Sequence, residues 1–199
     1  MMPDMAPRRS GPLALAILVY LGERPRHPYE IAADMRLRHQ HDSIKLNYGS
    51  LYSVIATLEK QGLIEVREVM REGRRPERTI YSITEAGRRE SVDWLSELLS
   101  APMKEYRDFE AALSLIGALP PDDVADLLRK RLAALDLQSH AAEALLASRD
   151  GKDLPRLFVL ENEYAQALLT AERQFVAALL ADIEQGTLEG LEAWRQWSQ

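Results

Sequence analysis

The sequence contains no cysteine. This absence excludes disulfide bonds, thiolate metal sites and cysteine nucleophiles, and it fits a protein of a reducing compartment. A membrane-spanning segment is also missing, because the longest apolar run, Leu13 to Leu21, is too short to cross a bilayer. The first residues lack the cleavage-like end of a secretory signal peptide. We therefore expect a cytoplasmic protein with no membrane partner.

Motifs that supply catalytic or metal chemistry are missing as well. The sequence holds no glycine-rich phosphate loop, no GxSxG motif and no HExxH motif. His39 and His41 stand two residues apart, a spacing that turns side chains away from each other on a helix, so that a polar loop is favoured over a metal site. The acidic pair Asp122 and Asp123 is explained by the dipole at a helix start. We predict a protein that is not an enzyme and has no cofactor and no metal.

The chain is acidic overall, but its charge is unevenly distributed. The 199 residues carry a net charge of −6. Residues 1–92 contain 15 Lys and Arg against 12 Asp and Glu, a net charge of +3, whereas residues 93–199 contain 10 against 19, a net charge of −9. This asymmetry indicates two modules with different partners.

The first module shows the periodicity of helices with one interruption. Apolar spacing, proline positions and capping residues predict helices over about 12–22, 48–61 and 85–100, and a second helix within 25–38 that has Pro28 near its start. Between the third and fourth helices, the alternating segments 64–70 and 78–84 predict a hairpin that places Thr79, Tyr81 and Ile83 on one face. Thr84 is the expected N-cap of the fourth helix. Three helices and a hairpin form the plan of a winged helix-turn-helix.

The third of these helices has well-defined ends. Asn47 is a suitable N-cap, and Gly62 is the expected stop, with Leu63 or Ile64 folding back onto the helix. Four apolar residues at helical spacing predict the face that packs into the core: Leu51, Val54, Ile55 and Leu58.

The opposite face of this helix carries small and polar residues. Gly49, Ser53, Ala56 and Lys60 point away from the predicted core, and Tyr52 lies at the flank. Small side chains let a helix backbone approach base edges, and Ser and Lys can bond bases or phosphates. The pattern favours a DNA-reading face over a plain surface helix. Tyr52 either bonds a phosphate or packs against the second helix.

The predicted wing is rich in arginine. Five arginines occur between residues 67 and 78, at positions 67, 71, 74, 75 and 78. Flexible arginines at a hairpin tip suit phosphates or a narrow minor groove. Arg74 and Arg75 are the first candidates, and Lys45, just before the third helix, is a further one. The glutamates of the same segment leave a solvated charged turn as the alternative.

The second half of the chain has helical patterning throughout, with predicted helices over 104–119, 120–148 and 154–185. The last helix has two adjacent apolar stripes, which predicts a helix covered on one side by its own domain and on the other by a partner subunit. The residues expected at this dimer contact are Leu157, Phe158, Tyr164, Leu168, Phe175 and Leu179. Trp194 and Trp197 are expected to pack on a helix.

Three segments of the first module carry a resemblance. HPYEI, YGSLYSVIATLEKQGLI and RTIYSITEAGRR closely resemble the N-terminal domain of PadR-type transcriptional regulators, in order and spacing, from Leu13 to Arg89. Pro28 stands where relatives often have Gly, and Ser53 where many have Pro, and both differences could alter DNA contacts. The resemblance implies a homodimeric, repressor-like DNA binder, commonly released by a small ligand.

Together these features predict a mainly α protein: a flexible N-terminus (1–11), a winged helix-turn-helix domain with a two-stranded wing (12–100) and an all-helical dimerisation domain (101–199). The expected partners are a double-stranded DNA operator, a second copy of the chain and a small-molecule effector, for which aromatic compounds are the first candidates. Trp94 either stacks on such an effector or packs in the core or at an interface. The alternative function is a winged-helix module for protein–protein contacts. The candidate DNA-binding residues are Tyr29, Lys45, Asn47, Tyr48, Gly49, Ser50, Tyr52, Ser53, Lys60, Arg71, Arg74 and Arg75.

Overall fold

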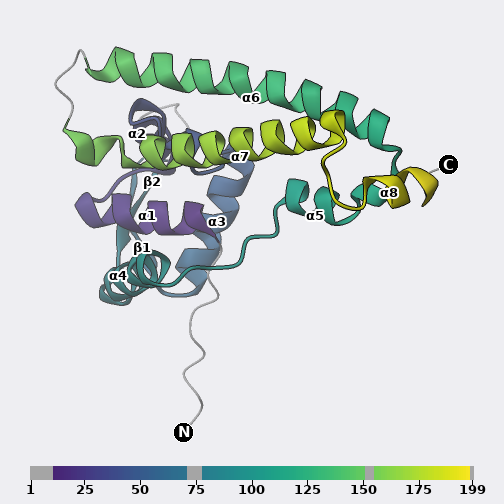
Figure 1. Cartoon of the computed structure of the whole chain (residues 1–199). Coiled ribbons are helices and arrows are strands. Elements are labelled where there is room, and N and C mark those ends of the chain that lie inside the picture. The colour runs from purple at the N-terminus through teal and green to yellow at the C-terminus, as the bar shows by residue number, and fades with distance from the viewer. Residues whose placement is uncertain (1–10, 71–77, 151–154, 198–199) are drawn as a thin grey trace, which may run out of the picture. The chain divides into compact units, whose positions relative to one another are not determined.

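The computed structural model describes residues 11–70, 78–150 and 155–197. The chain forms two compact units, Met1–Lys104 and Glu105–Gln199. The first unit contains α1 (Pro12–Glu23), α2 (Pro28–Leu37), η1 (Gln40–Asp42), α3 (Tyr48–Lys60), β1 (Ile64–Met70), β2 (Arg78–Ile83) and α4 (Glu85–Ser100) (Figure 1). The second contains α5 (Asp108–Ser114), η2 (Ile116–Ala118), α6 (Pro121–Asp150), η3 (Arg156–Phe158), α7 (Leu160–Gln185) and α8 (Leu191–Trp197).

Helix α1 is the centre of the first unit. It contacts α3, α4 and β2, and its Ile17 and Leu18 are completely buried. Such a helix is apolar almost all round because its neighbours cover it on several sides. Met35 of α2 and Leu51 of α3 complete the interior and are also fully buried.

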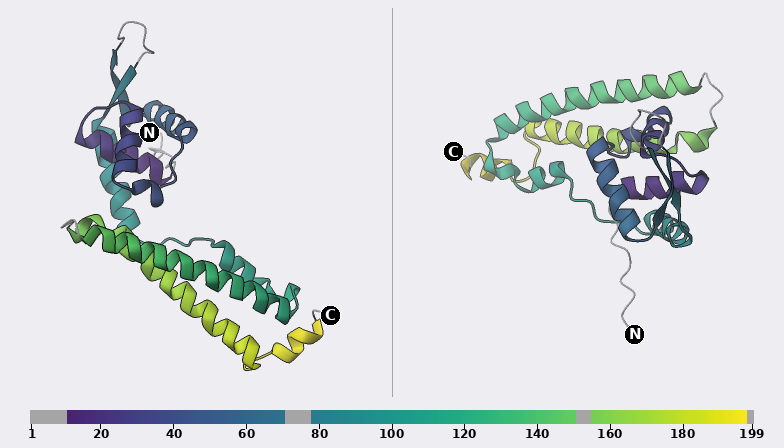
Figure 2. Two further views of the ribbon diagram at one scale, coloured as in Figure 1. Left: turned by 90° about the horizontal axis from the view of Figure 1, so that it is seen from above. Right: turned by 180° about the vertical axis from the view of Figure 1, so that it is seen from behind.

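The predicted hairpin is present, and it projects from the helices of its own unit (Figure 2, left). Strands β1 and β2 are antiparallel, with Ile64 opposite Ile83 and a register shift between Val66 and Glu68. Such an irregularity bends a strand and increases its twist. Tyr81 of β2 is paired a second time, because its backbone N–H and C=O both bond the backbone of Arg26 at 3.1 Å.

The turn from α3 into β1 confirms the predicted helix stop. Gly62 has a positive φ of 69°. The Leu63 N–H donates to the Leu58 carbonyl at 3.0 Å, and the Gly62 N–H donates to the Glu59 carbonyl at 2.9 Å. This pair of bonds defines a Schellman motif. Leu63 and Ile64 are 5% and 1% exposed, so both fold back into the core.

The start of α4 is fastened to the same turn. Thr84 is the N-cap, as predicted, and its hydroxyl accepts a hydrogen bond from the Gly87 N–H at 3.1 Å and donates one to the Gly62 carbonyl at 2.7 Å. A Cβ added at Gly87 would lie 2.0 Å from the carbonyl oxygen of Leu63. Only glycine therefore permits α4 to rest directly on this backbone.

In the second unit α6 and α7 run side by side over much of their length (Figures 1 and 2). Val176, Leu180 and Ile183 of α7 form a core with apolar residues of α6 and α8. Trp194 of α8 closes the end of this core, and its indole N–H donates to the Leu119 carbonyl at 2.8 Å. None of the helices among the described residues is long and apolar enough to cross a membrane.

Three sequence predictions in this unit were wrong. The segment 104–119 is not one helix, because α5 begins only at Asp108 and Leu115, at φ −115° and ψ 9°, leaves the helical conformation before η2. The last helix begins at Leu160 rather than at 154, because η3 and the non-helical Val159 precede it. Trp197 does not pack on a helix, since it is 80% exposed.

Candidate nucleic-acid interface

Helix α3 separates two faces, as the sequence predicts. Leu51 is fully buried, Ile55 and Leu58 are each 2% exposed, and Val54 is partly buried against the same core. On the opposite side four residues, which we call the outer face of α3, are exposed: Gly49, Ser53, Ala56 and Lys60. Tyr52 at the flank is 50% exposed, so its ring is partly covered and its remaining surface is accessible.

Local hydrogen bonds modify what this face offers to a ligand. Asn47 is the N-cap, and its side-chain oxygen accepts from the Ser50 N–H at 2.7 Å, which leaves its amide N–H groups and one oxygen lone pair for another partner. The Ser53 hydroxyl donates to the Ser50 carbonyl at 2.9 Å and therefore offers its lone pairs as acceptors. These bonds favour Ser53 as an acceptor and Asn47 mainly as a donor.

Two tyrosines and an arginine form a cluster beside the N-terminal end of α3. The rings of Tyr29 in α2 and Tyr48 in α3 are stacked, with centroids 6.1 Å apart and an interplanar angle of 8°. Arg36 donates from Nη1 to the Tyr48 hydroxyl at 2.9 Å, and its Cζ lies 4.9 Å from the centroid of that ring. The sequence pattern did not single out Arg36, because nothing local predicts that it would meet a residue twelve positions away.

The arginines on either side of α2 are neutralised locally. Arg26 is 1% exposed and donates to Asp34 at 2.5 Å and to Glu23 at 2.8 Å. Arg38 pairs with Glu23 at 3.0 Å. Its hydrogen bond is the main cause of a lowered pKa at the Glu23 carboxyl, and the bond from Arg26 adds to it. Among the described residues, Arg36 and Lys45 have no carboxylate partner, so their charge remains available to an anion.

The buried Arg26 was missed at the sequence level. Its side chain joins the end of α1 to α2 through Glu23 and Asp34, and its backbone pairs with Tyr81 of the wing. Its Cζ also lies 5.2 Å from the ring centroid of Tyr20. Buried charges require this kind of full pairing. Arg26 therefore fixes the wing relative to the helices of the same unit.

His27, which the sequence left without a role, caps α2. Its Nδ1 accepts from the Tyr29 N–H at 3.0 Å, and its backbone N–H donates to the Glu30 carboxylate at 2.8 Å, which completes a capping box. Burial, followed by the positive charge of Arg78, lowers the pKa of His27. The neutral imidazole, which can accept this bond, is thereby favoured, and the backbone that carries Tyr29 is held in place.

The described part of the wing carries two exposed arginines. Arg67 lies at the register shift of β1, and Arg78 begins β2. Arg71, Arg74 and Arg75, the predicted phosphate contacts at the tip, lie outside the described residues.

Trp94 was predicted as either an effector contact or a packing residue. It is 6% exposed and belongs to the core of the first unit. This burial favours the packing role.

The exposure of α7 divides the residues predicted for the dimer contact. Leu157 and Phe158 of η3 are 70% and 59% exposed, and Tyr164 and Phe175 of α7 are 64% and 51% exposed. Leu179 instead packs against the core of its own unit, so its burial there accounts for its apolar character.

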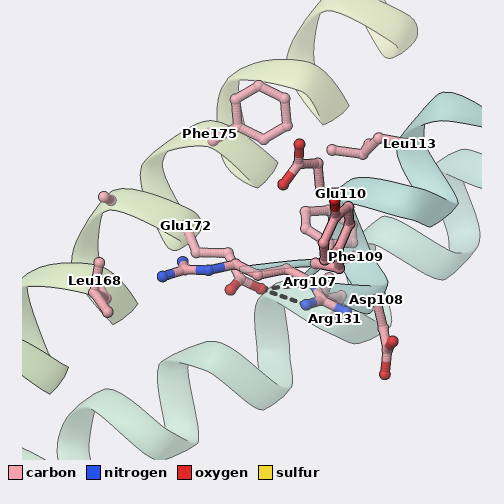
Figure 3. Close-up of a pocket in the computed structure, with 11 residues that line it drawn as sticks. Arg107, Asp108, Phe109, Glu110, Leu113, Arg131, Leu168, Glu172 and Phe175 are labelled. Atoms are coloured by element: carbon pink, nitrogen blue, oxygen red, sulfur yellow. Dashed lines mark hydrogen bonds and ion pairs between the residues drawn. The ribbon is translucent and has the colours of Figure 1, made fainter. Parts of the chain in front are cut away.

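A groove of about 670 Å³ lies between α5, α6 and α7 in the second unit (Figure 3). Phe109 and Phe175 line it from two sides, and Leu168 extends the apolar wall. The guanidinium of Arg131 lies 3.7 Å from the ring centroid of Phe109 and bonds Glu172 at 2.5 and 2.8 Å.

The charges of this groove nearly cancel. Arg107 and Arg131 are its cations, and its three carboxylates are Asp108, Glu110 and Glu172. The groove thus combines aromatic walls with a slightly negative lining.

The architecture of the first unit defines its class. Helices α1, α2 and α3, the hairpin β1–β2 and the closing helix α4 form a winged helix-turn-helix with a two-stranded wing. The exposed helix of such a domain is the element that enters the major groove in DNA-binding members of the class. Residues 17–92, which span this winged helix, match the model of the transcriptional regulator PadR-like family. The predicted resemblance is thereby confirmed for this part of the chain.

Solved structures with the same fold include members of that family. PadR from Bacillus subtilis in complex with operator DNA has a TM-score of 0.67 at 19% identity, over 86% of this chain and 98% of that one. The same protein in complex with p-coumaric acid has a TM-score of 0.68 at 18% identity, over 86% and 98%. The protein smu.1604c from Streptococcus mutans has a TM-score of 0.55 at 26% identity, over 84% and 98%. No curated protein sequence matches the chain significantly.

Proposed function

We propose that this protein is a cytoplasmic, homodimeric transcriptional repressor that binds an operator through α3 and has no enzymatic activity. The observation that carries the proposal is the outer face of α3. Its small and polar residues remain exposed on a helix whose other side is anchored by Leu51, Ile55 and Leu58. A rigidly anchored helix with an accessible backbone suits the major groove.

The relatives support this direction. In its complex with operator DNA, the B. subtilis protein shares the fold over 86% of this chain and 98% of its own chain. Across two half-sites, a dimer would place its recognition helices about 34 Å apart, or a multiple of this distance. The distance between the two Asn47 residues in a structure of the dimer measures this spacing.

An electrophoretic shift with the DNA upstream of the protein's own gene tests operator binding. Ser53→Ala should weaken binding to some sequences more than to others, because an acceptor on the outer face reads base donors. Lys60→Ala should weaken binding to all sequences by a similar factor, because a phosphate contact carries no sequence information. If both variants bind like the wild type, α3 is not the reading helix.

The homodimer is proposed from the exposed apolar side of α7. Tyr164, Leu168 and Phe175 recur at helical spacing on α7, whose other side is already packed against α6, and Leu157 of the preceding η3 is exposed as well. Large exposed apolar rows mark protein contacts more often than they mark free surface. Because this half of the chain is predicted to form a dimer, we propose that a second copy of the chain covers this row.

The effector is the third part of the proposal. The groove between α5, α6 and α7 has the volume of a small-molecule site and aromatic walls. Because its five ionised side chains sum to −1, we expect a neutral or cationic aromatic compound to bind better than an aromatic carboxylate. Calorimetric titration with p-coumaric acid and with its uncharged amide compares the two. Tighter binding of the acid would contradict this charge argument.

The alternative, a winged-helix module for protein contacts, is motivated by the net charge of −6. The excess of negative charge lies in residues 93–199, whereas the winged helix is slightly basic. A folded protein that shifts no DNA at low salt would decide in favour of this alternative.

A further inference from the structure

We infer that Arg36 and Tyr48 together bind one phosphate of the DNA backbone, with Tyr48 also holding Arg36 in place. This inference rests on the proposed DNA-binding function and extends it to a residue of α2. Arg36 and Tyr48 belong to different helices, yet Nη1 of Arg36 bonds the Tyr48 hydroxyl at 2.9 Å. Both side chains are exposed.

The charge of Arg36 distinguishes it from its neighbours. Arg26 and Arg38 are paired with Glu23, whereas no carboxylate of the described residues pairs with Arg36. A guanidinium that is already neutralised must lose its partner before it can bind an anion. Within the described ranges Arg36 has no such partner to lose, so its full charge acts on a phosphate.

The Tyr48 hydroxyl is arranged for the same ligand. Its oxygen accepts the bond from Arg36, so its own proton remains free to donate. The two side chains thus present an O–H group and the unused N–H groups of a guanidinium side by side. Phosphate oxygens accept several hydrogen bonds at once, and the planar guanidinium matches their geometry.

The cluster is also held in place before any ligand arrives. Tyr29 stacks on Tyr48 at 6.1 Å, and the capping box of His27 fixes the backbone that carries Tyr29. The guanidinium of Arg36 lies 4.9 Å from the Tyr48 ring centroid, within the range of a cation–π contact. A side chain ordered in advance loses less conformational entropy on binding.

The position of the cluster along α3 fits a backbone contact. Tyr48 is the first residue of α3 and directly precedes Gly49 of the outer face. Recognition helices approach base edges with their N-terminal residues. The DNA strand that passes this end of the helix brings its phosphates close to the same residues. Arg36 therefore flanks the bases that α3 would read.

The salt dependence of DNA binding tests the inference. Arg36→Gln should lower the slope of log K against log salt by about 0.9 for each phosphate that the protein no longer neutralises, or about 1.8 for a dimer with two such sites. The loss of affinity should be the same for the operator and for unrelated DNA. Arg36→Lys should keep the slope, because the charge remains, but bind more weakly because it lacks the planar fork.

Tyr48→Phe separates the positioning role from simple charge. The variant keeps the ring that stacks on Tyr29 but should weaken DNA binding in the wild-type background. In an Arg36→Gln background it should cause little further loss of affinity, because the two groups act on one phosphate. Arg89→Gln is the matched control, since Arg89 is an exposed arginine already paired with Glu85 at 3.4 Å, and it should leave the slope unchanged.

Three outcomes overturn the inference alone. An unchanged salt slope for Arg36→Gln would remove the phosphate contact, and a sequence-dependent loss would make Arg36 a base contact instead. Additive losses from Arg36→Gln and Tyr48→Phe would show that the two residues act separately. A wild-type protein that binds no DNA at low salt would instead defeat the proposed function itself, and the inference with it.

Discussion

The two units of the chain bury their apolar residues in different ways. In the first, helices from α1 to α4 and both strands contribute to one core, and α1 is buried almost all round. In the second, α6 and α7 share a narrower core, and four of the large apolar residues at the start and along α7 remain more than half exposed. The core of the first unit draws on α1 to α4, whereas that of the second is narrower. Large exposed apolar residues occur in both units, and in the first they include Leu37, Val92 and Leu99 at 79%, 64% and 80%.

This contrast follows from how the elements are connected. The first unit joins short elements by tight, hydrogen-bonded junctions, of which the Thr84 cap on the Gly62 carbonyl is one. The second consists mainly of two long helices, and a pair of helices can cover only one side of each member. Changes in the first unit should therefore affect folding, and changes on α7 should affect assembly.

The largest expected effect is that of Gly87→Ala on the first unit. The added Cβ would lie 2.0 Å from the Leu63 carbonyl oxygen and 2.8 Å from Ile83 Cγ1, and backbone cannot move aside cheaply. We expect a loss of about 3 kcal/mol or more in the free energy of unfolding. Urea denaturation followed by circular dichroism measures it.

Gly22→Ala is the matched control in α1, where an added Cβ meets only the flexible end of Arg88 at 3.8 Å. It should be neutral or stabilise by up to about 1 kcal/mol. Equal effects of the two variants would disprove the close contact between α4 and the turn.

The second expected effect is on assembly. Phe175→Glu places a charge on the exposed side of α7 and should weaken the dimer by about a hundredfold or more, with no loss of helix content. Light scattering over a range of concentrations measures the dissociation constant. Arg173→Glu is not a suitable control because Arg173 pairs with Asp136. Gln185→Glu, at the end of α7, adds the same charge away from the row and should leave the dimer intact.

A smaller effect is expected from acid on the first unit. The hydrogen bond from Arg38, and then that from Arg26, lowers the pKa of Glu23 below its ordinary value of 4.5. The pKa of Glu23 is lower in the folded state than in the unfolded state. The ionised carboxylate therefore stabilises the fold fully above the unfolded-state pKa, and this contribution is lost as the pH falls through the folded-state pKa. The side chain is 40% exposed, so solvent screens the contribution and keeps it modest.

Unfolding of wild type and Glu23→Gln between pH 7 and pH 3 measures this contribution. The difference in stability should be constant near neutral pH and shrink in acid. A difference that grows in acid would contradict the assigned direction of the pKa shift. Glu85→Gln, which removes an exposed pair with Arg89, should change little at either pH.

The smallest expected change in stability is that of Gly49→Ala. A Cβ there meets only the Asn47 side-chain oxygen at 3.6 Å, an ordinary contact, so the helix should gain up to about 1 kcal/mol. The same methyl group would stand on the outer face of α3 and reduce the affinity for DNA. An increase in both stability and DNA affinity would show that DNA does not contact the outer face of α3 at Gly49.

The features that the sequence predicted best are local. Asn47 and Thr84 cap the helices they precede, and Gly62 ends α3 with a positive φ. In each case a single residue type satisfies a backbone requirement within a few positions, so no tertiary information is needed. The buried side of α3 was equally predictable, because its apolar residues recur in the sequence with the helical period of 3.6 residues.

The features that were missed depend on contacts between distant residues. The burial of Arg26 requires Glu23, Asp34 and the backbone of Tyr81 to converge on it. The pairing of Arg36 with Tyr48 joins two helices whose crossing no pattern specifies. The start of α7 was placed too early because apolar spacing continues through η3, where the backbone is no longer α-helical.

The contact at Gly87 has a mechanical consequence. Because α4 meets the turn after α3 through the close approach at Gly87 and the bond from the Thr84 hydroxyl to the Gly62 carbonyl, little room remains there for a displacement. The joint is stiff, and α4 is the last helix of its unit before the chain continues into the second. A tilt of the C-terminal end of α4 would therefore be transmitted through the turn at Gly62 and would change the orientation of α3.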